Sequence, residues 1–162
     1  MRRPCTTRAF FEVLVAVLAA SSIAMAADQP TSEMMEPVEK IARFIARPVD
    51  GDLSAFASHD VVIVENFAPY VFDGPHAVQR WAEGMRAHVE TLGALAHRFS
   101  PAHDFSTSGD RAYFSLPTQW TGRAGAQGFV EDGGWSFVLV KENGGWRVLG
   151  YGWAVTKMEL VP

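Results

Sequence analysis

The chain has 162 residues, of which 48% are hydrophobic and 20% charged, and its formal net charge at pH 7 is −4. An acidic chain without a Lys/Arg cluster is not expected to bind nucleic acid. Cys5 is the only cysteine, so no internal disulfide is possible. The spacing of the remaining ligating side chains predicts no metal site and no bound cofactor.

Residues 1–26 are predicted to form a cleaved signal peptide. Arginines open the segment, residues 10–26 are almost wholly apolar, and Ala24-Met25-Ala26 matches the small-x-small pattern of a cleavage site. The apolar run is shorter than the roughly 20 residues that a membrane-spanning helix needs. We therefore predict cleavage after Ala26 and a soluble, periplasmic or secreted protein without membrane association. Residues 27–162 are then one domain of ordinary size.

Helices are predicted in the first half of this domain. Apolar residues recur at helical spacing after a capping Thr31 or Ser32, and Pro48 ends the pattern; the residues are Met34, Val38, Ile41 and Ile45. A short second helix is predicted over 51–56. A third helix opens at Asp73-Gly74-Pro75 and ends at Gly93.

Strands are predicted at Val61–Val64 and throughout the second half. The β-branched run 61–64 is typical of a strand. The later strand regions are 94–105, which Pro101 interrupts, and then 111–121, 129–141 and 146–155. The last two flank Asn143-Gly144, whose residues supply the positive φ angles of a tight hairpin. Helices followed by an antiparallel sheet indicate the α+β class.

Four stretches carry a resemblance to a known superfamily. They are Arg43-Phe44-Ile45-Ala46 with Gly51-Asp52-Leu53, Phe56-Ala57-Ser58-His59-Asp60 running into 61–66, Asp73-Gly74-Pro75-His76-Ala77-Val78 into Trp81, and Asn143-Gly144-Gly145-Trp146-Arg147-Val148 ending at Trp153. In this order they resemble the nuclear-transport-factor-2-like superfamily, in its SnoaL-like or ketosteroid-isomerase-like branch. The resemblance implies a cone-shaped, curved antiparallel sheet wrapped by about three N-terminal helices, as in cystatin-like folds. It also implies an apolar pocket and a homodimer formed through the outer sheet face.

Glu65 is the first candidate catalytic residue. It lies near the position where ketosteroid isomerases carry their general base, and burial in an apolar pocket raises the pKa of such a carboxyl toward neutral pH. By strand alternation Glu65 shares a face with Val61 and Ile63. A shift of one residue would place Asn66 there instead, leaving no base, and a solvent-exposed carboxylate is the alternative for Glu65.

The isomerase partners of this base are missing. The oxyanion-binding tyrosine of those enzymes corresponds to Phe44, which cannot donate a hydrogen bond, and no acid lies beside Trp135; Glu131 comes too early in the chain. His103 is a second candidate acid or base. Its neighbour Asp104 is not expected to orient the ring, because adjacent strand residues point to opposite faces.

Six aromatic residues are candidates for lining a ligand pocket: Phe44, Tyr70, Trp81, Trp120, Trp135 and Trp153. Aromatic walls with a few fixed polar groups are typical of small-ligand sites. Ordinary core packing is the alternative interpretation for the same rings.

These observations favour an exported domain that binds a small hydrophobic molecule. The alternative is a SnoaL-like enzyme of isomerase, cyclase or hydrolase type, with Glu65 as general base on a small cyclic or carbonyl substrate. A purely structural dimer with a filled core is a third hypothesis. The sequence leaves open whether the chain is an enzyme.

Overall fold

The computed structural model describes residues 28–48 and 52–162. The predicted signal peptide lies outside the described residues. Two α-helices, a short 3₁₀ helix and seven strands follow one another: α1 (Ser32–Ala46), η2 (Leu53–Ala55), β1 (Val62–Val64), β2 (Val71–Phe72), α2 (Ala77–Val89), β3 (Leu92–Phe99), β4 (His103–Ser108), β5 (Arg111–Ala124), β6 (Gln127–Glu142) and β7 (Gly145–Val161). Within these residues no helix is long and apolar enough to cross a membrane.

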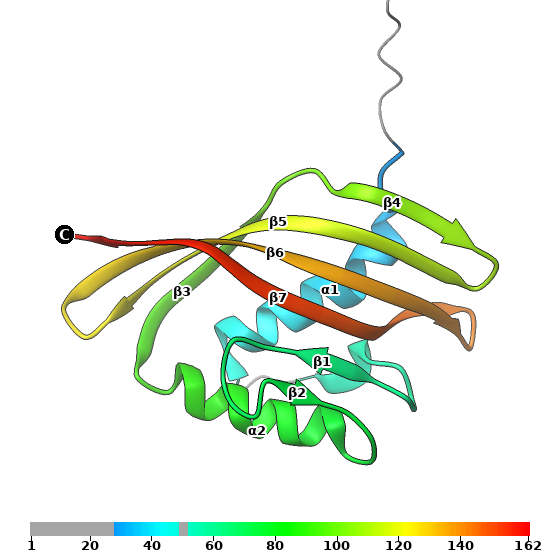
Figure 1. Ribbon diagram of the computed structural model, residues 1–162, viewed down its shortest axis with the longest axis horizontal. Helices are drawn as coiled ribbons and strands as arrows, with labels where there is room; N and C mark the ends of the chain where they lie inside the picture. The colour runs from blue at the N-terminus through cyan, green and yellow to red at the C-terminus, as the bar shows by residue number, and fades with distance from the viewer. Residues whose placement is uncertain (1–27, 49–51) are drawn as a thin grey trace, which may run out of the picture.

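The strands form one curved, open sheet. Its order is β2-β1-β7-β6-β5-β3, and β4 pairs with β5 alongside β3. In Figure 1 both helices and the β1–β2 pair lie on one side of the long strands β5, β6 and β7. The predicted α+β class and the curved sheet are therefore confirmed.

Two details of the predicted architecture differ. The sheet is mixed, because β1 pairs with β7 in parallel while the other pairs are antiparallel. This pairing joins segments about ninety residues apart, which a local pattern does not reveal. The helix expected over 51–56 is a single 3₁₀ turn, since Asp52 caps Ser54 N–H at 2.8 Å and Phe56 is already extended.

The two strongest local predictions are confirmed. The Thr31 hydroxyl accepts a hydrogen bond from Met34 N–H and caps α1, whose buried face includes the predicted apolar residues. Asn143 and Gly144 have φ angles of 50° and 80°, as a two-residue hairpin between β6 and β7 requires. This hairpin fixes the register of the two longest strands.

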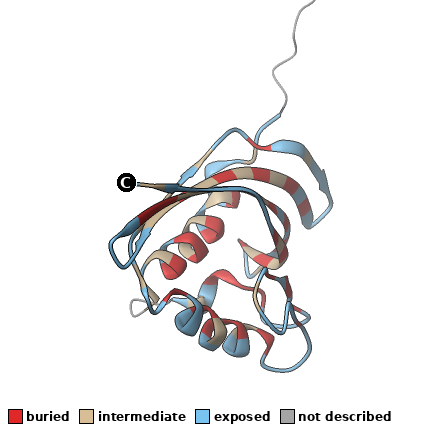
Figure 2. Cartoon of the chain, turned by 60° about the vertical axis from the view of Figure 1, so that its left-hand side comes forward, coloured by how far each residue is buried: buried red, intermediate tan, exposed pale blue. Residues whose placement is uncertain are grey.

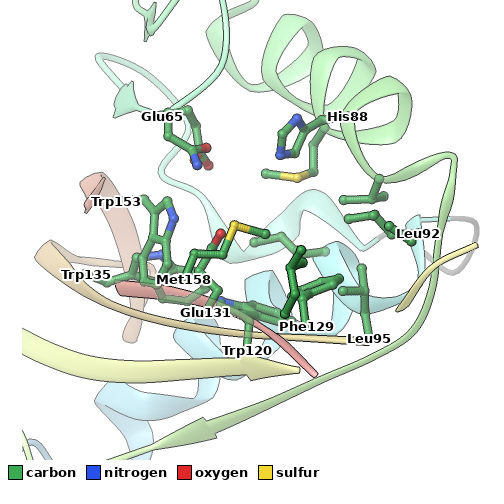
Figure 3. Close-up of a pocket in the computed structure, with 16 residues that line it drawn as sticks. Glu65, His88, Leu92, Leu95, Trp120, Phe129, Glu131, Trp135, Trp153 and Met158 are labelled. Atoms are coloured by element: carbon green, nitrogen blue, oxygen red, sulfur yellow. The ribbon is translucent and has the colours of Figure 1, made fainter. Parts of the chain in front are cut away.

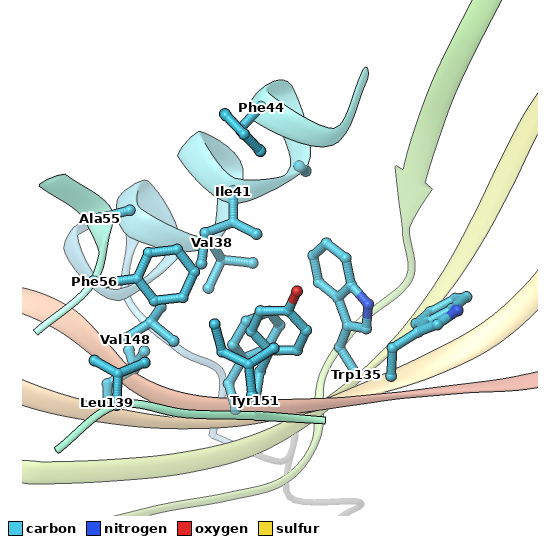
Figure 4. Packing of buried hydrophobic residues seen from close by; sticks show 14 of the residues in the cluster. Val38, Ile41, Phe44, Ala55, Phe56, Trp135, Leu139, Val148 and Tyr151 are labelled. Carbon is cyan, nitrogen blue, oxygen red and sulfur yellow. The ribbon is translucent and has the colours of Figure 1, made fainter. Parts of the chain in front are cut away.

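The hydrophobic core lies between α1 and the concave face of the sheet. Along β5 buried and less buried positions alternate, with Phe114 and Leu116 facing inward and Tyr113 outward. Figure 2 shows such alternation as red bands along the long strands. Val38 and Ile41 of α1 pack over this face, near Leu139 and Val148 (Figure 4). The apolar face of β5 is therefore the interior face.

Candidate functional site

A cavity of about 340 Å³ opens at the other end of the same strands. It is bounded by α2, β3, the last turn of α1 and the ends of β5, β6 and β7, and most of its walls are apolar (Figure 3). Three titratable side chains line it: Glu65, Glu131 and His88. Its volume is within the range of small-ligand pockets, so it is large enough for a ring system.

Glu65 follows β1 and points into the interior. Val61, Ile63 and Glu65 are buried while Val62, Val64 and Asn66 are exposed, which is the alternation of an extended strand. The Glu65 N–H donates to the Tyr70 carbonyl at 2.9 Å and closes the loop after β1. The carboxyl, rather than the neighbouring Asn66, therefore occupies the buried position.

The Glu65 carboxyl is held by two donors from different elements. Its Oε1 accepts hydrogen bonds from the Trp81 indole at 3.0 Å and from the Tyr151 hydroxyl. Burial raises the pKa of Glu65 above its usual value; these bonds and the Asn66 N–H oppose the rise, and the nearby Glu131 adds to it. A carboxyl with a raised pKa and a fixed orientation is suited to proton transfer.

Glu131 is a second carboxyl in the same cavity. It lies on β6 opposite Trp120 of β5 and Met158 of β7. Burial raises its pKa, and the nearby Trp153 indole opposes the rise. Sequence reasoning dismissed this residue as too early in the chain, although it shares strand parity with Trp135 and hence the interior face.

A glycine makes the room that Trp153 needs beside Glu131. A Cβ atom at Gly133 would lie 2.3 Å from the Trp153 ring and 2.5 Å from the Ala154 carbonyl oxygen. The indole therefore lies across β6 at the one interior position of this strand segment that lacks a side chain. This places its N–H within reach of Glu131.

His88 contributes a ring from α2. It lines the cavity, and its ring stacks on Phe67 with a centroid distance of 4.7 Å. Burial lowers the pKa of His88, which favours the neutral imidazole. The cavity therefore holds two carboxyls and a histidine that is mostly uncharged at neutral pH.

The structure brings some of the sequence-predicted site residues together. Trp120, Trp135 and Trp153 line the cavity with Glu65. Trp81 is fully buried and reaches the site only through its hydrogen bond to Glu65. It is a supporting residue rather than a lining one, because the interior stripe of α2 buries it in the core.

Three other predicted residues lie elsewhere. Phe44 is buried in α1 and packs on Trp81, with ring centroids 5.2 Å apart, outside the cavity lining. Tyr70 is 60% exposed in the loop after Glu65, because that loop turns outward to reach β2. His103 is exposed on β4 opposite Ser115, far along β5 from Trp120, and lines no part of the cavity.

A metal-binding arrangement is absent from the part of the chain that the structure describes. There, no three His, Cys, Asp or Glu side chains are grouped so that they could hold an ion.

Sequence comparisons identify no relative. No family model matches the chain, and no curated protein matches it. Solved structures do match. Hexachlorocyclohexane dehydrochlorinase LinA-type3 from Novosphingobium barchaimii superposes with a TM-score of 0.66 at 10% identity, covering 80% of this chain and 88% of that protein.

Two further structures have the same arrangement. A proposed scytalone dehydratase from Novosphingobium aromaticivorans has a TM-score of 0.59 at 15% identity and covers 76% of this chain and 81% of its own. A protein of unknown function with a cystatin-like fold, from Nostoc punctiforme, has a TM-score of 0.58 at 19% identity and covers 79% and 95%. The chain therefore has the nuclear-transport-factor-2-like, or SnoaL-like, fold that its sequence predicts.

Proposed function

We propose that this chain is an enzyme that moves a proton on a small, largely apolar cyclic or carbonyl substrate, with Glu65 as its general base. One observation carries the proposal: a carboxyl that is only 5% exposed forms part of the wall of an otherwise apolar cavity of about 340 Å³. Burying a carboxyl is costly, and such groups occur most often where their chemistry is used.

The environment of Glu65 suits this role. Its raised pKa makes the ionised form a stronger base than a carboxylate in water, and the hydrogen bonds of Trp81 and Tyr151 fix its orientation. The Phe44 position offers no hydroxyl, so the oxyanion arrangement of a ketosteroid isomerase is not part of the proposal. The dehydrochlorinase and the proposed dehydratase with the same fold support an enzyme by analogy alone.

Deuterium exchange into 1-indanone tests the proposal without knowledge of the natural substrate. Glu65 would take a proton from the carbon next to the carbonyl and leave an enolate, which regains a deuteron from D₂O. We expect the protein to accelerate this exchange, measured by ¹H NMR, and Glu65→Gln to reduce the acceleration about 100-fold or more.

Glu159→Gln is the matched control for this experiment. Glu159 lies on the exposed side of β7, where it forms an ion pair with Lys157 at 2.7 Å, and it should leave the exchange rate unchanged. Equal exchange rates in the wild-type protein and Glu65→Gln would refute the general-base role of Glu65.

The second candidate function is binding without turnover. It is favoured by the two donors on Glu65 Oε1, because a carboxyl fixed in this way also serves to orient a ligand. In that case native mass spectrometry of the protein from its exporting host should reveal a retained hydrophobic molecule, and 1-indanone should bind without exchanging.

We also propose that the protein is exported and forms a homodimer. The arginine-rich, apolar start of the chain supports export, and the intact mass of a chain beginning at Ala27 would agree with it.

The proposed homodimer would form through the outer sheet face. Tyr113 and Val138, paired across β5 and β6, are each 37% exposed there and support self-association. Analytical ultracentrifugation of Val138→Lys should show a monomer if the dimer uses this face.

A further inference from the structure

The charges around the cavity are of one sign. Its lining includes the carboxyls of Glu65 and Glu131 but no lysine or arginine, and its third titratable group is His88, whose pKa burial lowers. A ligand with a carboxylate or phosphate would meet no positive partner and two acidic groups. Such a ligand is disfavoured, because a buried charge needs an opposite charge or good donors.

The ring arrangement around Glu131 suits a cation. Trp120 and Trp135 have centroids 6.2 Å apart, and Trp153 meets Trp135 edge to face at 5.8 Å. All three line the cavity beside Glu131, as Figure 3 shows. Indole faces attract organic ammonium groups, and a carboxylate within an aromatic enclosure supplies the opposite charge.

We propose that the substrate of this site is a small cyclic amine, bound as its ammonium ion between Glu131 and the three tryptophans. This inference rests on the proposed function: Glu131 holds the cation, while Glu65, whose carboxyl accepts hydrogen bonds from Trp81 and Tyr151, remains the base. We assign the two roles by position. Glu131 lies on β6 beside the three tryptophans, and Glu65 lies on the loop after β1.

A cation in the cavity also changes the ionisation of its acidic groups. Without a ligand, burial raises the pKa of both carboxyls, and the charge of Glu131 raises the pKa of Glu65 further. An ammonium ion lowers both pKa values and releases protons. His88 contributes little to this release, because burial already favours its neutral form and a nearby cation makes its protonation still less favourable.

Three probes with one ring system separate the possible ligand classes. They are 2-aminoindane, which is a cation at pH 7, the neutral 2-indanol, and the anion indane-2-carboxylate. We expect isothermal titration calorimetry to show about tenfold tighter binding of 2-aminoindane than of 2-indanol, and the weakest binding for the anion. Repeating the titration in buffers of different ionisation enthalpy should reveal proton release with the amine alone.

Glu131→Gln tests the assigned residue. It should remove the preference for 2-aminoindane and leave the affinity for 2-indanol within about threefold, while the exposed Glu159→Gln retains the preference. Circular dichroism confirms that each variant is folded. Equal binding of the amine and the alcohol, no amine binding at low millimolar concentration, or a preference that survives Glu131→Gln would overturn the inference.

The outcomes for the two proposals are separable. If Glu65→Gln abolishes exchange into 1-indanone but the amine is not preferred, the amine inference fails and the general base stands. If the amine is preferred through Glu131 but exchange does not depend on Glu65, the proposed catalytic function fails instead.

Discussion

The two ends of the long strands β5, β6 and β7 have opposite characters. At one end Phe114, Phe137 and Val148 are completely buried, and Val148 faces α1 in Figure 4. At the other end the same interior face bears Glu131, Met158 and Leu160, and Leu160 is 69% exposed. The same strand alternation produces both ends. The difference comes from what covers them, because α1 ends at Ala46 and the cavity begins beside its last turn.

This comparison shows how one sheet separates stability from function. The covered end buries apolar side chains at close packing and contributes most of the hydrophobic stabilisation. The open end retains the buried carboxyl of Glu65 and the half-buried carboxyl of Glu131, which are unfavourable for folding in their charged forms. A substitution should therefore affect mainly the free energy of unfolding at the first end and mainly ligand chemistry at the second.

Phe137→Ala should produce the largest loss of stability. Phe137 is fully buried against Phe114 and Trp135, so its removal leaves a cavity and should lower the free energy of unfolding by about 3–5 kcal/mol. Leu160→Ala at the open end should change it by about 0.5 kcal/mol or less. Urea denaturation measures both, and similar losses for the two variants would remove the distinction between the ends.

Two adjacent glycines, Gly133 and Gly134, test how closely the cavity wall is packed at the open end. Gly133→Ala would bring a methyl group into the Trp153 ring and should cost about 1–3 kcal/mol of stability and weaken probe binding. A Cβ at Gly134 meets nothing within 4 Å, so Gly134→Ala should have little effect on either. Thermal melts and 2-indanol titrations would contradict this account if the two variants behaved alike.

Tyr151→Phe removes one donor from Glu65 without changing the shape of the ring. Leaving the buried carboxyl short of a hydrogen bond should cost about 1–2 kcal/mol of stability. The lost bond favoured the ionised form, so the pKa of Glu65 should rise further and the pH profile of 1-indanone exchange should move to higher pH. The half-exposed Tyr113→Phe serves as the control, and an unmoved profile would exclude this tuning role of Tyr151.

The smallest expected effect is a pH dependence of stability. Because the folded-state pKa of Glu65 is raised above about 4.5, the folded chain binds more protons than the unfolded chain above that pH, and stability falls as pH rises through the folded-state pKa. Glu65→Gln cannot lose this contribution. The melting temperature of Glu65→Gln minus that of the wild type should therefore increase as the pH rises from about 4.5 to neutrality. A constant difference would indicate that the Glu65 pKa is unshifted.

Much of the fold follows from local sequence patterns. The Thr31 cap, the spacing of apolar residues in α1 and the Asn143-Gly144 turn each specify an element through interactions within a few residues. Alternation also placed Glu65 on the buried face with Val61 and Ile63. The parallel β1–β7 pair was missed because its partners are distant in sequence, and Glu131 because its site forms only when β5, β6 and β7 lie side by side.

The sequence by itself therefore determined the class of fold, most of the helices and strands, and the alternation of side chains along each long strand. These depend on short-range sterics, capping and periodicity. Only the tertiary structure decided which aromatic residues line the cavity of Glu65 and Glu131, and that Phe44, Tyr70 and His103 do not line it. Whether an inward side chain fills the core or lines a hollow depends on the element that covers it, and that element is contributed by a remote part of the chain.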